Sequence, residues 1–337
     1  MYYCAHIGEK KKEEWERLVA GNRRSGFHQS FGWAKFKQLD GWDTYKIGLF
    51  AAADDRLVGG AVIYEFGFSD GTSFLYLPEG PVLDYDDEEK LFWQWRALET
   101  ALHSIVKLKA EETTTHIRIE PRSETLPEWF RSGWHKAPLN LQPRHTQVVS
   151  LVPGESAIAA AMKPKGRYNI RIAQKRGVTV ATAPVAEVGD FFRLYRKTCV
   201  RDKFEGKDKE MFLRLFEGMG RQAELFFAEA AGRRLATAIV MYYGGRATYL
   251  YGASDDEQRN YMAPYLLHWE IMMEAKRRGY REYDFWGVAP SLDKPHEWAG
   301  LTVFKKKFGG EQLDLVGAWD YVLQQDKYDA FVRKHEA

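Results

Sequence analysis

The chain has 337 residues with 49 basic and 47 acidic side chains, so its net charge is only +2. This balance excludes a protein that binds nucleic acid with its whole surface, and any RNA contact must come from a local patch. Two cysteines exclude a disulfide framework and a cysteine-rich metal site. The length favours two domains. Because the start has no apolar signal segment and no apolar run approaches ~18 residues, we expect a cytoplasmic protein, at most peripheral to the inner face of a membrane.

The first part of the chain alternates helices and strands. A helix is predicted over residues 10–20, and Ser30 is a suitable N-cap for a second helix that carries Trp33 and Lys37. An aromatic, basic face of this kind is also typical of an ordinary packing helix. Strands are predicted over residues 45–53, 57–66, 74–77 and 116–120, with a helix over 86–107 before the last of them.

The same order returns in the second part of the chain. Strands are predicted over residues 224–230, 234–243, 247–251 and 283–287, with a helix over 264–278 before the last of them. The hairpin segments 56–64 and 234–242 align by eye. The repetition predicts two copies of one mixed α/β unit, joined by a linker near residues 138–146.

A basic stretch follows the linker. Residues 163–176 hold six basic side chains in fourteen positions and no acid: Lys163, Lys165, Arg167, Arg171, Lys175 and Arg176. Such a stretch suits phosphate contacts that do not read base sequence, but a solvated helix with its charges spread around is an equal alternative. Pro164, Gly166 and Gly177 interrupt the stretch, which favours a shaped surface.

Three adjacent lysines follow the last predicted strand, at positions 305 to 307. Neighbouring side chains cannot share one face of a regular element, so at least one lysine is expected to point inward. A solvated basic turn is the competing interpretation.

Several unusual segments recur in an order that resembles the FemABX family, the aminoacyl-tRNA-dependent transferases that build peptidoglycan interpeptide bridges. The segments span nearly the whole chain and are Gln29-Ser30-x-x-Trp33-Ala34-x-x-Lys37, Gln142-Pro143-Arg144-His145-Thr146, Arg167-x-x-Ile170-x-x-Ala173-x-x-x-Gly177-Val178, Tyr249-x-Tyr251-Gly252-Ala253, Ala263-Pro264-Tyr265 and Gly300-Leu301-x-x-Phe304-Lys305-x-x-Phe308-Gly309.

The resemblance implies a fold and a division of labour. Each unit is expected to be a GNAT-like acyltransferase unit with a mixed sheet flanked by helices, and no segment suits the coiled-coil arm that some members carry. The first unit would comprise residues 1–145 and 311–337 and bind the peptidoglycan precursor. The second unit, residues 146–310, would take the aminoacyl-tRNA side and the catalytic lysine, with a cleft between the two. We expect a monomer that needs no cofactor, no metal and no DNA.

The resemblance also assigns roles to residues. Lys37 matches a lysine that contacts the diphosphate of the precursor, which is UDP-MurNAc-pentapeptide or lipid II, and Trp33 belongs to the same segment. A second cation matches Lys207, although relatives can have arginine there and Arg201 or Lys203 remain alternatives. Tyr251 matches a tyrosine of the substrate channel. The tRNA backbone would lie on the basic stretch, and Phe304 and Lys305 match the pair beside the reacting ester.

The implied chemistry is aminolysis of an activated ester, which needs a neutral amine and a donor for the developing oxyanion. An ammonium at Lys305 would be that donor, and the ribose hydroxyl of the tRNA would relay the proton. Glu120, at the end of a predicted strand, is a candidate carboxylate near the cleft.

Two other classes of protein remain as alternatives. One is an acyltransferase of envelope or exopolysaccharide modification with a non-tRNA donor, and the other is a non-catalytic binding relative. Acetyl-CoA suits neither unit, because residues 258–264 lack glycine and residues 84–89 are acidic where a pyrophosphate would lie. The retained Lys305 favours an enzyme.

Overall fold

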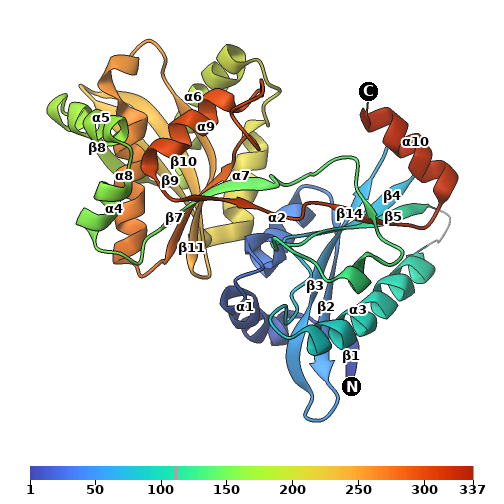
Figure 1. Ribbon diagram of the computed structural model, residues 1–337. Helices are drawn as coiled ribbons and strands as arrows, with labels where there is room; N and C mark the ends of the chain where they lie inside the picture. Colours follow the sequence, from blue (N-terminus) through green and yellow to red (C-terminus); the bar gives the residue numbers. More distant parts are fainter. Residues whose placement is uncertain (110–112, 337) are drawn as a thin grey trace. The chain divides into compact units, whose positions relative to one another are not determined.

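The computed structural model describes residues 1–109 and 113–336 and divides into two compact units. Unit 1 comprises Met1–Arg144 and Leu315–Ala337, and unit 2 comprises His145–Asp314. Each unit is built on one seven-stranded mixed sheet with helices packed against it (Figure 1). Within the described residues, no helix is both long and apolar enough to cross a bilayer.

Unit 1 has the sheet order β1-β2-β3-β4-β5-β14-β6. Its strands are β1 (Tyr2–His6), β2 (Asp43–Ala51), β3 (Arg56–Gly67), β4 (Ser73–Pro78), β5 (Thr114–Glu120), β6 (His135–Lys136) and β14 (Trp319–Val322); its helices are α1 (Lys12–Gly21), α2 (Phe31–Leu39), α3 (Glu88–Lys109) and α10 (Gln325–Glu336). The predicted helix over 86–107 is α3, and its apolar side is buried on the sheet, where Trp95, Leu98 and Leu102 cluster with Ile117 and Ile119.

Unit 2 has the sheet order β13-β7-β12-β11-β10-β9-β8. Its strands are β7 (His145–Ser150), β8 (Thr179–Ala183), β9 (Ala223–Ala230), β10 (Arg233–Tyr243), β11 (Arg246–Ser254), β12 (Glu282–Gly287) and β13 (Glu311–Asp314). Its helices are α4 (Glu155–Ala161), α5 (Pro164–Lys175), α6 (Val188–Asp202), α7 (Lys209–Met219), α8 (Ala263–Arg277) and α9 (Ala299–Lys305).

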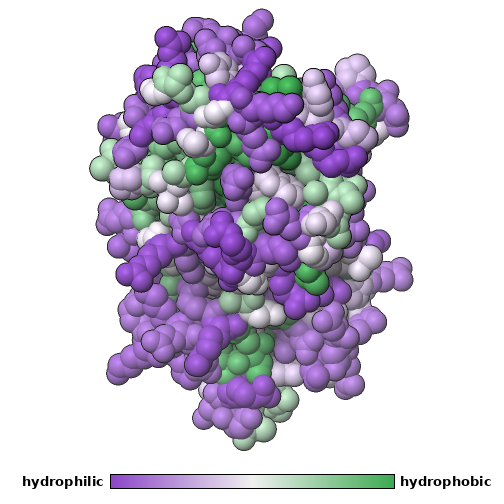
Figure 2. Space-filling view, turned by 90° about the vertical axis from the view of Figure 1, so that its left-hand side faces the viewer, coloured by the Kyte–Doolittle hydropathy of each residue, from purple (hydrophilic) through white to green (hydrophobic). Residues whose placement is uncertain are grey.

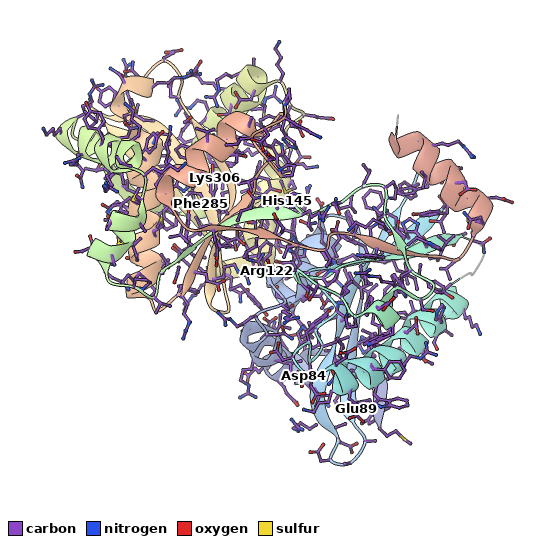
Figure 3. All side chains as sticks on the ribbon, viewed as in Figure 1. Asp84, Glu89, Arg122, His145, Phe285 and Lys306 are labelled. Carbon is purple, nitrogen blue, oxygen red and sulfur yellow. The ribbon has the colours of Figure 1, made fainter. Side chains whose placement is uncertain are left out.

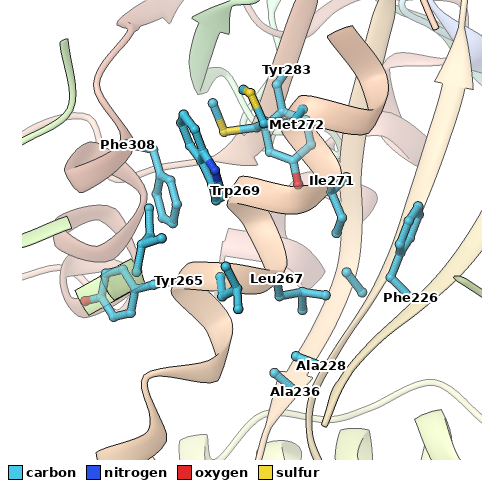
Figure 4. Close-up of a cluster of buried hydrophobic side chains, with 14 of the residues drawn as sticks. Phe226, Ala228, Ala236, Tyr265, Leu267, Trp269, Ile271, Met272, Tyr283 and Phe308 are labelled. Atoms are coloured by element: carbon cyan, nitrogen blue, oxygen red, sulfur yellow. The ribbon is translucent and has the colours of Figure 1, made fainter. Parts of the chain in front are cut away.

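Helix α8 supplies the centre of the unit 2 core. Figure 4 shows Leu267, Ile271 and Met272 of this helix in the cluster that also holds Phe226 of β9 and Phe308. The helix is buried along most of its length and packs against strands β8 to β11 of the sheet.

The predicted repeat is confirmed by the connectivity. In unit 1, β2, β3 and β4 are antiparallel neighbours, and α3 crosses over to β5, which lies parallel to β4. In unit 2, β9, β10 and β11 are antiparallel neighbours, and α8 crosses over to β12, which lies parallel to β11. Among the described residues the longest helix is α3, with 22 residues. The described residues therefore contain no coiled-coil arm.

In each sheet, one strand lies between two strands that are far from it in the sequence. Strand β7 directly follows β6 of unit 1, yet it lies between β12 and β13 of unit 2. Strand β14 directly follows β13 of unit 2, yet it lies between β5 and β6 of unit 1. Unit 2 is therefore an insertion into unit 1, and the last strand of unit 1 comes from the far end of the chain.

A buried ion pair holds this late strand in place. The Arg118 guanidinium of β5 donates two hydrogen bonds, of 2.7 and 2.6 Å, to the carboxylate of Asp320 on β14. Both side chains are 0% exposed, and the hydroxyl of Tyr328 on α10 donates to the same carboxylate at 2.8 Å. A two-point pair of this kind fixes both register and orientation.

The first prediction concerns this pair. Asp320→Ala leaves the Arg118 charge buried without its partner, so we expect the free energy of unfolding to fall by about 3–5 kcal/mol. Asp54→Ala removes the exposed partner of Arg56 and serves as the control, with an expected loss below about 1 kcal/mol. Chemical denaturation followed by circular dichroism measures both. Equal stability of the two variants would show that the pair does not hold β14.

Candidate functional site

The segment that resembles the family's first motif fixes the start of α2. The Ser30 hydroxyl accepts a hydrogen bond from the Trp33 N–H at 3.0 Å, which confirms the predicted N-cap. The Gln29 side chain bonds to both backbone groups of Val62 and to the Pro78 carbonyl. These two residues therefore orient the helix on which Lys37 lies.

The ammonium of Lys37 lies among aromatic rings. Its Nζ is 4.4 Å from the ring centre of Trp42, 4.8 Å from that of Phe36 and 5.9 Å from that of Trp33. Asp40 Oδ2 lies 3.7 Å away, and the Lys37 side chain is 20% exposed. Trp33 is itself buried by its neighbours, so the geometry gives it the task of supporting Lys37, whose contact with a ligand stays a prediction.

Glu120 is occupied by the protein itself. Its buried carboxylate accepts hydrogen bonds from the backbone N–H groups of Leu141 and Gln142, at 2.6 and 2.9 Å, and from the Tyr76 hydroxyl. Burial raises the pKa of Glu120 to about 7, although these hydrogen bonds and Arg118 act in the opposite direction. The Glu120 carboxylate therefore anchors the segment that contains Gln142, and its contact with a substrate stays a prediction.

Lys305 is the inward member of the lysine triplet. Lys305 is the last residue of α9, so it lies in a helix and not in a turn. Its side chain is buried, with 4% of its surface exposed. Its Nζ donates to the Gly287 carbonyl at 2.7 Å and lies 5.8 Å from the ring centre of Tyr249. Burial lowers the pKa of Lys305 to about 7, which the Asp284 carboxylate partly opposes.

The outer two lysines lie differently. Lys306, labelled in Figure 3, directly follows α9. Its side chain is half-buried, and the ammonium of Lys307 donates to the Tyr265 hydroxyl at 3.0 Å. The inference that one lysine points inward is confirmed, and the alternative of a fully solvated turn is wrong for this segment.

Aromatic side chains surround Lys305. The Phe304 ring contacts those of Tyr265, His268 and Phe308 at centroid distances of 5.1 to 5.5 Å. The His268 Nδ1 lies 2.8 Å from the Tyr283 hydroxyl. Burial, with the charge of Lys305, lowers the pKa of His268 to about 3. Of these two basic side chains, the lysine alone is positioned to carry charge near neutral pH.

A bulge at the end of β12 presents the carbonyl that Lys305 uses. The register between β12 and β7 shifts between Asp284 and Gly287, and Trp286 adopts a positive φ of 62°. The Trp286 N–H donates to Asp284 at 2.8 Å, and the Thr146 hydroxyl donates to the same carboxylate. A bulky residue in this conformation stores strain of about 1–3 kcal/mol, which is typical of functional sites.

Two candidates from the sequence, Tyr251 on β11 and Lys207 between α6 and α7, meet at one aromatic cluster. The half-buried Tyr251 ring contacts Phe212 and Tyr195, and the Tyr195 hydroxyl accepts from the Lys207 N–H at 3.2 Å. The Lys207 side chain is exposed beside this cluster. Of its alternatives, Arg201 is bonded to Asp202 and to the Ser254 carbonyl, and Lys203 is exposed in a left-handed conformation.

The basic stretch forms α5, together with the residues that flank it. Five of its six cations are exposed, namely Lys163, Lys165, Arg171, Lys175 and Arg176. The half-buried Arg167 instead donates to the carbonyls of Ala159, Ala160 and Met162 at the end of α4. Figure 2 shows the side of the molecule where α4 and α5 lie in Figure 1, and most of that face is hydrophilic. The surface of α5 is thus basic, and five of the six predicted cations lie on it. The sixth, Arg167, is bonded to the end of α4.

Comparison with known proteins places these features in a family. The sequence matches the family model described as the FemAB family over residues 11–123, 132–234 and 230–333. A curated relative is the "Lipid II:glycine glycyltransferase" of Staphylococcus saprophyticus subsp. saprophyticus, 24% identical over 392 aligned residues, which cover 93% of this chain and 92% of the relative.

Solved structures show the same fold. The chain in "Crystal structure of FemX" superposes with a TM-score of 0.85 at 23% identity, with coverage of 98% of this chain and 99% of that one. A tandem GNAT protein from the clavulanic acid biosynthesis pathway superposes with a TM-score of 0.57 at 13% identity, over 96% of this chain and 98% of that one. The fold is thus two GNAT-like units in tandem.

The second prediction follows from the position of Arg167. Because its guanidinium satisfies carbonyls at the end of α4, Arg167→Ala should lower the free energy of unfolding by about 1–3 kcal/mol. Arg171→Ala, on the same helix but exposed, should change it by no more than about 0.5 kcal/mol. Thermal or urea denaturation compares the two. If Arg171→Ala were the more damaging, Arg167 would not be a helix cap.

Proposed function

The chain belongs to the FemAB family, and from this premise we propose that it is an aminoacyltransferase that moves an amino acid from aminoacyl-tRNA to the stem-peptide amine of a peptidoglycan precursor. The observation that carries the proposal is the buried ammonium of Lys305, held at the end of α9 by the Gly287 carbonyl. A desolvated cation at a strand end is suited to stabilise negative charge that appears only in the transition state.

The reaction proposed is aminolysis of the ester that joins the amino acid to the tRNA. The neutral acceptor amine attacks the ester carbonyl carbon, and the carbonyl oxygen becomes an oxyanion. Lys305 donates one of its remaining N–H groups to that oxygen. When the tetrahedral intermediate collapses, the C–O bond to the ribose breaks, the amide bond remains, and the amine proton passes to the departing ribose oxygen through the neighbouring hydroxyl.

The substrates are proposed from the relatives and from the charged surfaces. The relatives are named for lipid II and glycine, and we carry over the reaction class: a stem-peptide acceptor on UDP-MurNAc-pentapeptide or on lipid II. Unit 1, with Lys37, is proposed to bind the precursor, and α5 of unit 2 is proposed to bind the tRNA backbone. Because charged tRNA is a cytoplasmic molecule, we place the reaction on the cytoplasmic side.

An acyl-CoA donor fits unit 2 poorly. The start of α8 is the place where a GNAT-like unit would hold pyrophosphate through free backbone N–H groups. Here Pro264 has no N–H, and the Tyr265 N–H already donates to the Met262 carbonyl at 3.0 Å. This geometry supports a donor other than acyl-CoA.

The proposal is tested by incubating the purified protein with a pool of charged tRNAs and with UDP-linked or lipid-linked stem peptide. Mass spectrometry of the acceptor should show the mass of one added amino acid, dependent on charged tRNA. Uncharged tRNA is the control. No mass change with any charged tRNA and either acceptor would contradict the proposed function.

The third prediction concerns Lys305. Lys305→Met keeps the length of the side chain and removes its charge, so kcat should fall by about 10²–10³-fold. Binding of both substrates should change little, because the charge on the oxyanion appears only in the transition state. Single-turnover kinetics with charged tRNA measures the loss.

The pH dependence checks the same assignment. The ammonium is required and its pKa is about 7, so after correction for deprotonation of the acceptor amine the rate should decrease as the pH rises through 7. The residual activity of Lys305→Met should lack this decrease. Wild-type kcat in Lys305→Met would remove the lysine from the mechanism.

The fourth prediction concerns α5. Replacing Lys165 and Arg171 together with alanine should weaken tRNA binding and reduce the slope of log K against log salt by about 1–2. The matched control is Arg193→Ala with Arg196→Ala on α6, which removes two exposed charges outside the basic stretch. Filter binding at a series of salt concentrations gives the slopes. An unchanged slope in the α5 variant would show that RNA lies elsewhere.

A further inference from the structure

Helix α5 has a glycine in its first turn. A glycine inside a helix costs about 1 kcal/mol relative to alanine, so Gly166 needs a structural reason. A Cβ on Gly166 would lie 2.6 Å from the carbonyl oxygen of Lys307 and 3.3 Å from its carbon. Because both are backbone atoms, no rotamer change can make room. The start of α5 therefore packs directly on the backbone of the lysine triplet.

Hydrogen bonds strengthen this contact. The Lys307 carbonyl accepts the Lys163 N–H at 3.0 Å. Two residues later, a Cβ on Gly309 would lie 2.7 Å from the Ala161 carbonyl oxygen, and the Gln147 side chain donates to the Gly309 carbonyl at 2.7 Å. We call the contact of Lys163 and Gly166 with the Lys307 backbone the clamp.

The clamp lies two residues beyond Lys305 along a continuous helical path. Helix α9 ends at Lys305, and the 3-10 turn Lys306–Phe308 follows without a break, with Lys305 itself in a right-handed helical conformation. A shift of the Lys307 backbone therefore moves the Lys305 backbone, whose ammonium is held only 2.7 Å from the Gly287 carbonyl. Small displacements matter here because a misplacement of about 1 Å can lower a rate by about 10²-fold.

We propose that Gly166 is a positioning residue. Through the clamp, helix α5, which presents the exposed basic side chains, also determines the position of Lys305. The inference rests on the proposed function, since it gives α5 a second task beyond contact with the RNA backbone. One backbone contact then links the helix proposed to meet RNA to the placement of the catalytic ammonium. Disturbing that contact should affect catalysis without removing any charge.

The test uses two matched glycines. Gly166→Ala forces the Lys307 carbonyl away, so kcat should fall by about 10–10²-fold while the salt dependence of tRNA binding stays unchanged. Gly189→Ala is the control, since Gly189 also lies in the first turn of a helix, α6, and its Cβ would meet nothing within 4 Å. This control should keep wild-type kcat.

A second pair of variants covers the case in which Gly166→Ala does not fold. Lys163 has φ −63°, which proline adopts without strain, so Lys163→Pro removes the N–H that bonds to Lys307. Lys163→Ala removes the side-chain charge alone. The ratio of kcat between these two variants isolates the hydrogen bond, and we expect the proline variant to be the slower by several-fold.

A readout without tRNA separates this inference from the proposed function. The rate at which an amine-selective reagent modifies Lys305, followed by mass spectrometry across pH, reports the titration of its ammonium. In Gly166→Ala, Lys305 should titrate at a higher pH than in the wild type, because displacement exposes the ammonium to water. Wild-type titration together with wild-type kcat in both clamp variants would overturn the inference. If the wild-type protein transfers nothing and Gly166→Ala still shifts the titration of Lys305, only the proposed function is overturned.

Discussion

The removal of one lysine ammonium from water is the constraint on which the second unit depends. An isolated buried charge is costly, and the protein offers Lys305 the Gly287 carbonyl at 2.7 Å, the charge of Asp284 and aromatic rings. The carbonyl is available because β12 ends in a bulge with Trp286 in a strained conformation. The neighbouring His268 avoids a second charge by remaining neutral. Strain and burial are thus concentrated around one lysine side chain.

Much of this arrangement could be predicted from the sequence because it follows local periodicity. The repeated hairpins, α3 and α8 show clear apolar patterns, and Ser30 has the residue type and place of an N-cap. Strands β8 and β14 were not predicted. Strand β8 is mostly exposed and lacks an apolar face, and β14 owes its place to Arg118, a partner some 200 residues away. A pairing between residues so far apart in the chain cannot be detected from the local pattern of apolar and polar residues.

The candidate site was predictable in part for a similar reason. The three adjacent lysines required that one point inward, and the structure identifies Lys305. The roles of Glu120 and Arg167 were not predictable, because a carboxylate or a guanidinium has the same appearance in sequence whether it meets a substrate or a backbone. Only the structure shows the hydrogen bonds that both make within the protein, Glu120 with Leu141 and Arg167 with the end of α4.

The insertion of one unit into the other also determines the order in which the polypeptide can fold during synthesis. As the chain leaves the ribosome, β1 to β6 emerge first, but β5 lacks the neighbour that only residues 319–322 supply. Unit 2 is continuous from His145 to Asp314 and is complete while the first sheet is still open. Domains usually fold in the order of their synthesis. Here the amino-terminal unit must finish last, with an unpaired strand edge exposed until residues 319–322 have been synthesised.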